Sequence, residues 1–378
     1  MKLVIVLLTH IDNLPPARNL LISLSKIEIK VELITMYSAA LPEQIRKAGN
    51  ITIHDVQSEI ANNKLQALKN RFKRRRKVRT LIKEIMSDRD VLWTVTDYDA
   101  MEVGDILNNY RHVMQLMELI QDIPIFDELP FYKANLQKYA QTAEMVIVPE
   151  YNRAYIQQAY WQLKNTPKVL PNKPTVYKQE YDIEAISPKG AEVLSEIGNR
   201  KIVLYQGVFG YERVLDQFIE AVEQLGDDYC MLLMGRDDEE LQKLLEKYPE
   251  TFFVPFIAAP NHLAITSKAH IGVLSYVNTN NIRHYDPLNA LYCAPNKLYE
   301  YACFGIPMIG NDIPGLRIPF EQNNIGRCSE LKANEIAEAI RKIEMDYSQM
   351  SKNCIQFYES IDMDKLVGEL VKDLISKE

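Results

Sequence analysis

Two turns in the C-terminal half combine glycines with a basic side chain, as a binding site for an anion would. Gly207 and Gly210 enclose the expected turn between a buried strand and a helix, and Arg213 follows them. Gly235 and Arg236 take the same position after the next strand. Glycine allows a ligand close to the backbone, and arginine binds phosphate well. We therefore expect a phosphate-bearing ligand here, the alternative being ordinary turns with surface arginines.

A third segment places a cation and a carboxylate on one face of a short helix. Pro295 precedes the helix, and Asn296 is a plausible N-cap. Lys297 falls in the first turn, where a cation opposes the helix dipole unless an anion lies nearby. Glu300 follows Lys297 at a spacing that lets both side chains contact one ligand. The alternative is an amphipathic helix with a simple Lys–Glu pair.

These segments belong to a chain in which short apolar runs alternate with helical stretches. This alternation predicts parallel sheets covered by helices. Strands are expected at residues 3–8, 31–35, 90–95, 111–116, 145–148, 201–206, 229–234, 270–275 and 306–309. Helices are expected at residues 17–25, 42–48, 97–109, 212–225, 238–247, 296–304, 333–344 and 363–376.

The chain divides near Pro171 and Pro174, which interrupt both helix and strand pairing. Residues 1–170 hold 23 basic and 19 acidic residues, and residues 171–378 hold 21 and 32. We predict an α/β fold of two Rossmann-like doubly wound domains facing across a cleft, residues 1–170 and 171–360. We expect residues 361–378 to form a C-terminal helix that packs back on the N-terminal domain. Ligands of such sheets bind beyond the carboxyl ends of the strands.

Composition excludes several classes of protein. The 378 residues are 47% hydrophobic and 25% charged, with a net charge of −7, which argues against disorder and fibrous repeats. No apolar run approaches the ~20 residues of a membrane-spanning helix, and we expect no signal peptide. The 5 cysteines form no CxxC pair, which favours a reducing cytoplasm over disulfides or a zinc module.

Three segments, in order, resemble the retaining glycosyltransferases of the GT-B fold, specifically the GT4 family. Glu300, a short helix and Gly305-Ile306-Pro307-Met308-Ile309 resemble its donor-binding motif. The end of a strand and the loop after it, from Tyr205-Gln206-Gly207 through Arg213, resemble its phosphate-contacting loop. Residues 146–150, Asn152-Arg153 and residues 170–174 resemble the end of the N-terminal domain in a bacterial subset associated with polysaccharides.

This resemblance implies roles in binding a nucleotide sugar. Glu300 would bind the ribose hydroxyls, Arg213 and Lys297 (or Asn296 beside it) the diphosphate, and Gly207 would let the backbone approach. The family often has a second glutamate where Tyr292 stands. The residues expected to hold the donor sugar instead are Asn289, Cys293, Ala294 and Pro295. Arg236 is expected to contribute to the same donor site.

The N-terminal domain would hold the acceptor. The family often has a His-Glu or His-Asp pair after one of its strands, and here Met117 replaces the histidine while Glu118 remains. Glu118 is therefore the expected catalytic or acceptor-orienting carboxylate, the alternative being an ordinary acid at a helix N-terminus. His10, after the first strand, is the next candidate, and we expect His112 to be structural.

A basic stretch between Lys64 and Lys83 holds 10 Lys or Arg residues and no acid. Leu65, Leu68 and Phe72 recur within it at roughly helical spacing, as in helices that lie on anionic membranes. A solvated helix face is the alternative. Nucleic-acid binding is not expected, because the whole chain is acidic and no nucleic-acid module accompanies the stretch.

The sequence thus predicts a cytoplasmic glycosyltransferase, peripheral at the inner face of the cell membrane. It would move a hexose, with retention of the anomeric configuration, from a UDP- or GDP-linked sugar to a glycan or lipid-linked glycan. No resident cofactor is expected and no metal, since Asp97-Tyr98-Asp99 is the nearest approach to a metal triplet. The alternatives are a non-catalytic partner that binds a glycan or another transferase, and a nucleotide-sugar epimerase or hydrolase.

Overall fold

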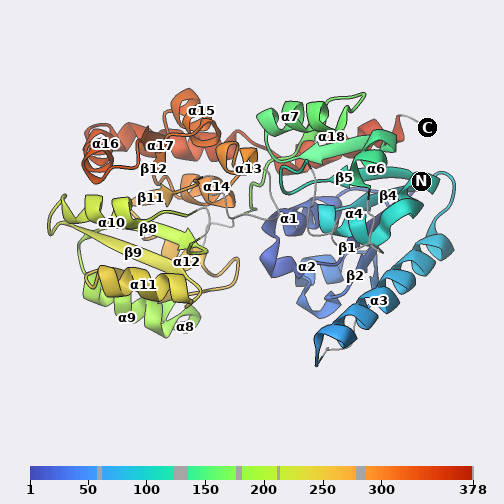
Figure 1. Cartoon of the computed structure of the whole chain (residues 1–378), viewed down its shortest axis with the longest axis horizontal. Helices are drawn as coiled ribbons and strands as arrows, with labels where there is room; N and C mark the ends of the chain where they lie inside the picture. Colours follow the sequence, from blue (N-terminus) through green and yellow to red (C-terminus); the bar gives the residue numbers. More distant parts are fainter. Residues whose placement is uncertain (58–61, 122–134, 176–180, 211–212, 278–286, 377–378) are drawn as a thin grey trace. The chain divides into compact units, whose positions relative to one another are not determined.

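The computed structural model describes residues 1–57, 62–121, 135–175, 181–210, 213–277 and 287–376. The chain separates into two compact units. The first comprises Met1–Asn172 and Asp362–Glu378, and the second comprises Lys173–Ile282 and Pro287–Ile361. Each unit is built around its own parallel sheet (Figure 1).

The first unit contains a 7-stranded sheet in the order β3-β2-β1-β4-β5-β6-β7, in which every pair of neighbours is parallel. Its strands are β1 Leu3–Leu7, β2 Val31–Thr35, β3 Ile51–Asp55, β4 Val91–Thr94, β5 Arg111–Gln115, β6 Met145–Val148 and β7 Lys168–Val169. The strand order reverses direction between β1 and β4. This switch point is where a doubly wound sheet opens a crevice for a ligand.

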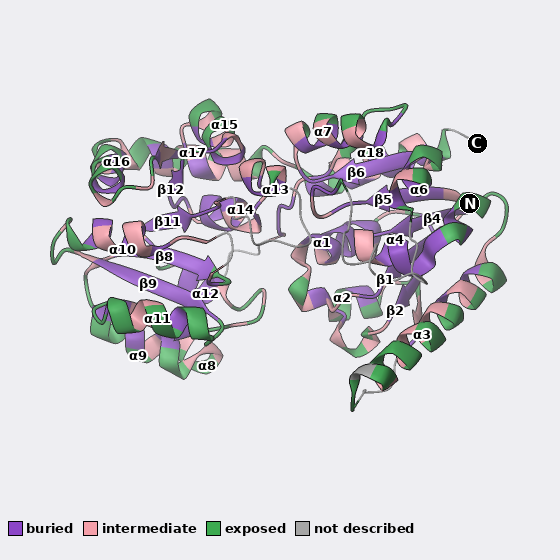
Figure 2. Cartoon of the chain, in the orientation of Figure 1, coloured by how far each residue is buried: buried purple, intermediate pink, exposed green. Residues whose placement is uncertain are grey.

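Helices cover both faces of this sheet, so its central strands are buried throughout, as Figure 2 shows. They are α1 Pro15–Leu24, α2 Glu43–Arg46, α3 Lys64–Ile85, α4 Asp97–Val103, α6 Leu136–Thr142, α7 Tyr151–Trp161 and α18 Met363–Ile375. Short 3-10 helices lie at Ile11–Asn13 (η1), Ser38–Ala40 (η2) and Gly104–Asn109 (η3). The C-terminal helix α18 packs on α1, and Asp364 accepts hydrogen bonds from Ser23 and Lys26, each at 2.7 Å.

The second unit contains a 6-stranded parallel sheet in the order β10-β9-β8-β11-β12-β13. Its strands are β8 Lys201–Gly207, β9 Tyr229–Gly235, β10 Phe252–Pro255, β11 Ile271–Leu274, β12 Met308–Asn311 and β13 Gly326–Ser329. Its helices are α8 Ile183–Ile186, α9 Pro188–Ile197, α10 Asp216–Glu223, α11 Glu239–Lys247, α12 Leu263–Thr266, α13 Leu288–Leu291, α14 Asn296–Cys303, α15 Pro314–Asn323, α16 Ala333–Met345 and α17 Tyr347–Glu359. Here the switch point lies between β8 and β11.

The predicted fold class, two doubly wound α/β domains, is confirmed. The predicted helix at residues 212–225 is wrong at its start, because α10 begins at Asp216. Ser275 explains the shorter helix: its hydroxyl accepts from the Val214 N–H at 3.1 Å and donates to the Val214 carbonyl at 2.7 Å. These bonds hold the preceding loop out of the helix. Glu212, at the start of the predicted helix, lies outside the described residues.

Gly235 fits where no other residue would, at the end of β9 beside the end of β8. A methyl group at this position would lie 2.2 Å from the Gly207 carbonyl oxygen and 2.7 Å from the Phe209 ring. Gly235→Ala should lower the free energy of unfolding by about 1–3 kcal/mol, because backbone atoms must move apart. Urea unfolding measures the change. Gly368→Ala is the matched control, because a methyl group there meets nothing within 4 Å, and it should not destabilise.

Candidate functional site

Two cations of the second unit gather at the carboxyl ends of β8 and β11, the switch point of its sheet. The Arg213 guanidinium lies 3.9 Å from the centre of the Tyr276 ring, and the Lys297 ammonium lies 5.5 Å from the same ring. Lys297 also lies 4.4 Å from the centre of the Tyr205 ring. The tyrosine faces attract both cations, but they do not neutralise them. An anionic ligand would.

Gly207 lets the backbone approach this pair of cations. Its φ of +137° is one that L side chains rarely adopt, and a methyl group on it would lie 3.2 Å from the Lys297 ammonium. The loop beyond it is fixed by Tyr205, whose hydroxyl donates to the Val208 carbonyl at 2.6 Å. The structure therefore brings Gly207, Arg213 and Lys297 together, as the sequence predicted.

The pKa of Lys297 is lowered from 10.5 to about 7. Burial is the main cause, since it disfavours the charged amine, and the nearby Arg213 charge acts in the same direction. Glu300 opposes the shift without cancelling it. A lysine with a lowered pKa beside an arginine, at the switch point of a sheet, is typical of a site that binds an anion.

Glu300 lies one turn further along α14, and its carboxylate is held on both sides. Gln206 donates to Oε2 at 2.6 Å, and His262 Nε2 lies 3.2 Å from Oε1. Burial opposes the charge on Glu300, but His262, Lys297 and the Gln206 hydrogen bond outweigh it and lower the pKa of the carboxyl below its ordinary value. Glu300 is thus an ionised acceptor beside the two cations.

His262 is a site residue that the sequence did not reveal. It immediately precedes α12, far from Glu300 along the chain, and no motif surrounds it. Gln206 belongs to the segment predicted to contact phosphate, but no residue spacing indicated that its side chain contacts Glu300. Contact between these side chains is a product of the fold rather than of local spacing.

Asn296 lies at the start of α14, beside Lys297, whereas Arg236 lies apart from the pair formed by Arg213 and Lys297. Asn296 is the first helical residue of α14 and Pro295 is its N-cap, so the expected N-cap at Asn296 is wrong. Proline at that position has no side-chain oxygen to cap the helix. Arg236 is exposed, and its guanidinium lies 5.6 Å from the centre of the Phe256 ring. Arg236 therefore lies near the end of β10, whereas Arg213 and Lys297 both contact the Tyr276 ring.

The predicted sugar-binding loop is compact. Asn289 and Cys293 are buried. Gly315 allows α15 to approach this loop, because a methyl group there would lie 2.6 Å from the Cys293 nitrogen. Ala294 is partly exposed beside the buried Pro295.

In the first unit, Glu118 follows β5 in an irregular segment rather than at a helix N-terminus. Its side chain is 37% exposed, and its Oε2 lies 3.9 Å from the buried Arg153 guanidinium. Arg153 also donates to the Met117 carbonyl at 3.0 Å. The Gln157 side chain accepts a hydrogen bond from the Ile120 N–H and donates one to the Ile120 carbonyl. α7 therefore fixes the backbone around Glu118 and leaves its carboxylate accessible.

Asp97 is a second carboxylate at this edge of the sheet, and its place in the sequence indicated only a resemblance to a metal-binding triplet. It follows β4, next to β5 in the sheet, and begins α4. The pKa of Asp97 is raised from 3.8 to about 6, first by burial and then by the charge of Glu118. Glu118 therefore lies close enough to Asp97 to raise the pKa of that carboxyl at the carboxyl edge of this sheet.

His10 follows β1 at the same edge, but its side chain is engaged locally. Its Nδ1 accepts from the Asp12 N–H at 3.4 Å, and its ring lies 4.8 Å from that of Tyr37. His112 lies inside β5, as predicted, with its two ring nitrogens 3.0 and 2.8 Å from the carbonyls of Tyr110 and Tyr139. Burial lowers the pKa of His112, in keeping with a structural histidine.

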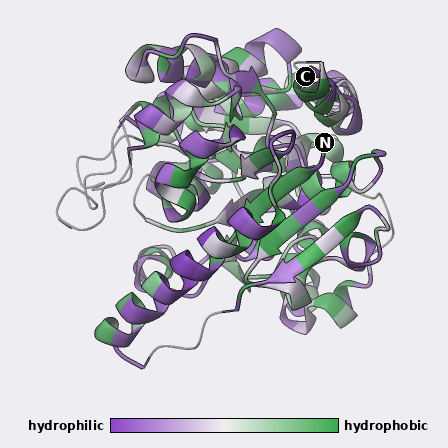
Figure 3. Ribbon diagram, turned by 90° about the vertical axis from the view of Figure 1, so that its right-hand side faces the viewer, coloured by the Kyte–Doolittle hydropathy of each residue, from purple (hydrophilic) through white to green (hydrophobic). Residues whose placement is uncertain are grey.

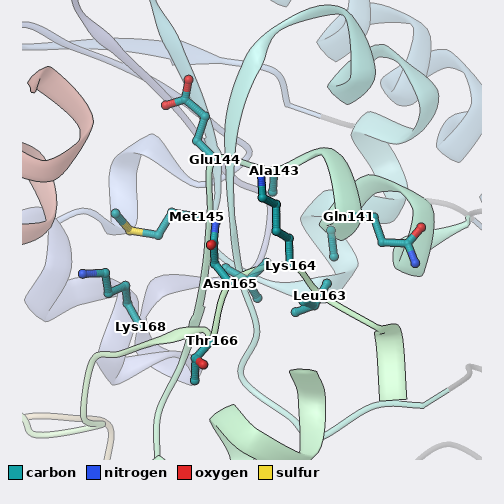
Figure 4. A pocket seen from close by; sticks show the side chains of 11 residues that line it. Gln141, Ala143, Glu144, Met145, Leu163, Lys164, Asn165, Thr166 and Lys168 are labelled. Atoms are coloured by element: carbon teal, nitrogen blue, oxygen red, sulfur yellow. The ribbon is translucent and has the colours of Figure 1, made fainter. Parts of the chain in front are cut away.

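A cavity of about 410 Å³ opens at the other end of the first sheet, where Met145 begins β6 (Figure 4). Glu144 and Lys168 line it with polar groups. Both are already paired, since Arg111 binds Glu144 at 2.6 Å and Lys168 binds Asp373 at 2.7 Å. This cavity is not at the carboxyl ends of the strands, where the predicted site residues lie.

The predicted basic helix is present as α3, but its cations serve two purposes. Several arginines on one side bind the rest of the unit: Arg71 to Glu102 at 2.8 Å, Arg74 to the Tyr98 hydroxyl at 2.7 Å and Arg79 to Asp105 at 2.6 Å. Leu65, Leu68 and Phe72, in the first half of α3, are exposed, with exposed fractions of 64%, 45% and 46%. The exposed cations are Lys69, Lys73, Arg76, Lys77 and Lys83. Figure 3 shows α3 as a predominantly hydrophilic helix interrupted by apolar positions.

Within the described part of the chain, no helix is long and apolar enough to cross a membrane. Across the same residues, no three His, Cys, Asp or Glu side chains gather as metal ligands would.

No protein-family profile matches the sequence, and no curated protein matches it. Solved structures share its fold over the full length. Anabaena HepE in complex with UDP has a TM-score of 0.67 at 12% identity and covers 100% of both chains. A glycosyltransferase from Rickettsia africae has a TM-score of 0.67 at 11% identity, covering 99% of this chain and 97% of its own. The UDP-GlcNAc 2-epimerase of Neisseria meningitidis bound to UDP-GlcNAc has a TM-score of 0.60 at 13% identity and covers 100% of both. At these identities the likeness establishes the GT-B fold.

Proposed function

We propose that this protein is a glycosyltransferase that moves a hexose from a nucleotide diphosphate sugar to a glycan or lipid-linked glycan. The second unit would bind the donor and the first the acceptor. The observation that carries this proposal is the pairing of Arg213 and Lys297 against Tyr276, beside the carboxylate of Glu300. Two cations suit a diphosphate, and an ionised carboxylate suits the two hydroxyls of a ribose. Similar folds solved with UDP and UDP-GlcNAc support the ligand class.

The chemistry follows from the change of charge during transfer. The bond between the anomeric carbon and the diphosphate oxygen breaks, and negative charge grows on the leaving diphosphate. Arg213 and Lys297 would stabilise that charge more strongly in the transition state than in the ground state, which raises turnover. We propose that the acceptor hydroxyl attacks from the face that the diphosphate leaves and gives its proton to the departing diphosphate oxygen, so that the anomeric configuration is retained. No metal is required in this scheme.

On the acceptor side, we propose Glu118 as the carboxylate that orients the attacking hydroxyl. Its partly exposed carboxylate and its fixed backbone suit that role. Asp97, with a pKa of about 6, would share the hydroxyl-binding surface. His10 is the reserve candidate, because its Nδ1 already caps η1.

A nucleotide-sugar epimerase or hydrolase is the second candidate. Such chemistry uses acidic and basic groups in the site, and the structure places Asp97 beside Glu118. A raised carboxyl pKa next to a second carboxylate is a feature of acid–base catalysis. A non-catalytic partner protein is a weaker alternative, favoured by Met117 and Tyr292, where the resemblance expects polar groups.

A donor panel separates these functions. The full chain is incubated with UDP-, GDP- and TDP-hexoses, with and without glycan acceptors, and the products are identified by NMR. Transfer predicts a free nucleoside diphosphate and a glycoside with the donor's anomeric configuration. An isomerised sugar nucleotide would instead indicate an epimerase, and inverted product would contradict retention. No turnover of any donor by a folded protein that binds nucleotide would support the non-catalytic alternative.

We further propose that the protein is peripheral at the inner face of the cell membrane and binds anionic lipid through exposed side chains of α3. Leu65, Leu68 and Phe72 are exposed apolar side chains with exposed lysines among them. Such a helix lies in the membrane interface with its apolar side chains inserted. The inward arginines, including Arg71 and Arg74, bind groups of the protein itself.

Replacing Lys69, Lys73 and Arg76 with glutamine should release the protein from anionic vesicles. Each basic residue near an anionic surface contributes about 1 kcal/mol, so binding should weaken by about 100-fold at low salt. Vesicle sedimentation at two salt concentrations measures this. The matched control changes the same amount of charge at the exposed Lys268, Lys352 and Lys365. Equal loss in both variants would indicate a general charge effect and contradict the role of α3.

A further inference from the structure

The carboxylate of Glu300 is held by Gln206 and His262, which have no role in the proposed transfer reaction. Gln206 donates to one oxygen at 2.6 Å, and His262 Nε2 lies 3.2 Å from the other. Gln206 is itself held by Thr266, whose hydroxyl lies 2.7 Å from Oε1 of the amide. The same hydroxyl lies 3.1 Å from the His262 carbonyl. The four side chains thus form one connected, largely buried network.

The network determines how the amide and the imidazole are oriented. Because the Thr266 hydroxyl donates to Gln206 Oε1, the amide must present its NH₂ group to Glu300. On His262, Nδ1 is buried without a hydrogen-bond partner among the described residues. A proton on Nδ1 would leave a buried donor unsatisfied, which favours the tautomer with its proton on Nε2. His262 therefore donates to Glu300.

These bonds occupy one position on each carboxylate oxygen. An ionised carboxylate accepts about four hydrogen bonds, so each oxygen keeps capacity for one more. Vicinal ribose hydroxyls supply two donors. We infer that His262 and Gln206 are positioning residues that hold the Glu300 carboxylate for bidentate recognition of the nucleotide's 2′- and 3′-hydroxyls. This inference rests on the proposed donor site.

The expected consequence is a loss of discrimination between ribose and deoxyribose. A carboxylate that can rotate would still carry its charge, but it would no longer meet both hydroxyls at once. A general loss of packing, in contrast, would weaken binding of both nucleotides alike. The ratio of two affinities therefore separates positioning from structural damage.

The test measures binding of UDP and 2′-deoxy-UDP to the full chain by calorimetry. The wild type should bind UDP about 10-fold more tightly, the effect of one hydrogen bond to a charged group. His262→Ala should reduce this ratio to about 3-fold or less while binding 2′-deoxy-UDP nearly as the wild type does. His262→Gln keeps an N–H donor and should restore part of the ratio.

His270→Ala is the matched control. His270 forms the same kind of pair in the same unit, with Nε2 at 2.6 Å from Glu344 Oε1, and its loss should leave the UDP preference unchanged. If the wild type prefers UDP and His262→Ala keeps that preference, the inference is wrong. Equal binding of UDP and 2′-deoxy-UDP by the wild type would also overturn it. Failure of the wild type to bind any nucleoside diphosphate would instead remove the proposed function itself.

Discussion

Affinity for UDP should fall as the pH rises above about 7, by up to about ten-fold for each pH unit. Lys297 has a pKa of about 7 in the free protein, lowered by burial and by Arg213. A bound diphosphate favours the charged amine and raises that pKa, so binding above pH 7 must take up a proton. Below pH 7 the amine is already charged, and its contribution no longer depends on pH. Calorimetric titrations from pH 6 to pH 9 measure the change.

Two substitutions at the same position isolate the contribution of Lys297. Lys297→Arg keeps a permanent charge, so the affinity of this variant for UDP should not fall above pH 7. Any pH dependence that remains in this variant is due to titration of the nucleotide. Lys297→Met should bind UDP about 10-fold or more weakly at pH 6.5 and approach the wild type at pH 9. A wild-type affinity that follows the arginine variant across the whole range would contradict the assigned pKa.

The second large effect concerns Arg213. Arg213→Ala should weaken donor binding about ten-fold or more and lower kcat by about 10²–10³, because the guanidinium would stabilise charge that grows in the transition state. Steady-state kinetics with the active UDP-sugar separate the two effects. Arg341→Ala is the control, since that arginine is exposed and its guanidinium lies 3.4 Å from a backbone carbonyl, that of Gln224.

Glu118→Gln supplies the contrast on the acceptor side. It should lower transfer to acceptor while leaving UDP affinity unchanged, because Glu118 belongs to the other unit. If transfer by this variant equals that of the wild type, Glu118 is structural, and His10 and Asp97 become the residues to test. If Arg213→Ala changes affinity without changing kcat, Arg213 binds the donor but does not assist its chemistry.

The sequence predicted the fold well because the buried strands are short apolar runs. β2 and β6 have the predicted bounds, and the central strands of both sheets lie where apolar residues concentrate. β3, with its Ile-Thr-Ile-His-Asp sequence, was missed because only part of it is buried. α17 was missed because only Met350 and Cys354 of its residues are buried. It packs on α14, where the Phe357 ring stacks on that of Tyr299 at 5.6 Å between ring centres.

The site was predictable where its residues share a turn or a helix. Gly207, Arg213, Lys297 and Glu300 each followed from local spacing, and the structure brings them to one end of one sheet. His262 could not be found in this way, because its contact with Glu300 depends on how α12 packs near α14. The pairing of Asp97 with Glu118 likewise depends on β4 and β5 being neighbours.

Titration of the full chain with UDP, GDP and TDP, and with UMP for comparison, tests the central claim most directly. The claim is that the second unit binds a nucleoside diphosphate through Arg213, Lys297 and Glu300. At least one diphosphate should bind, about ten-fold or more tightly than the monophosphate, since the second phosphate meets a cation. Arg213→Ala and Glu300→Ala should each weaken that binding about ten-fold or more. Absence of binding by every diphosphate, or unchanged affinity in both variants, would contradict the account.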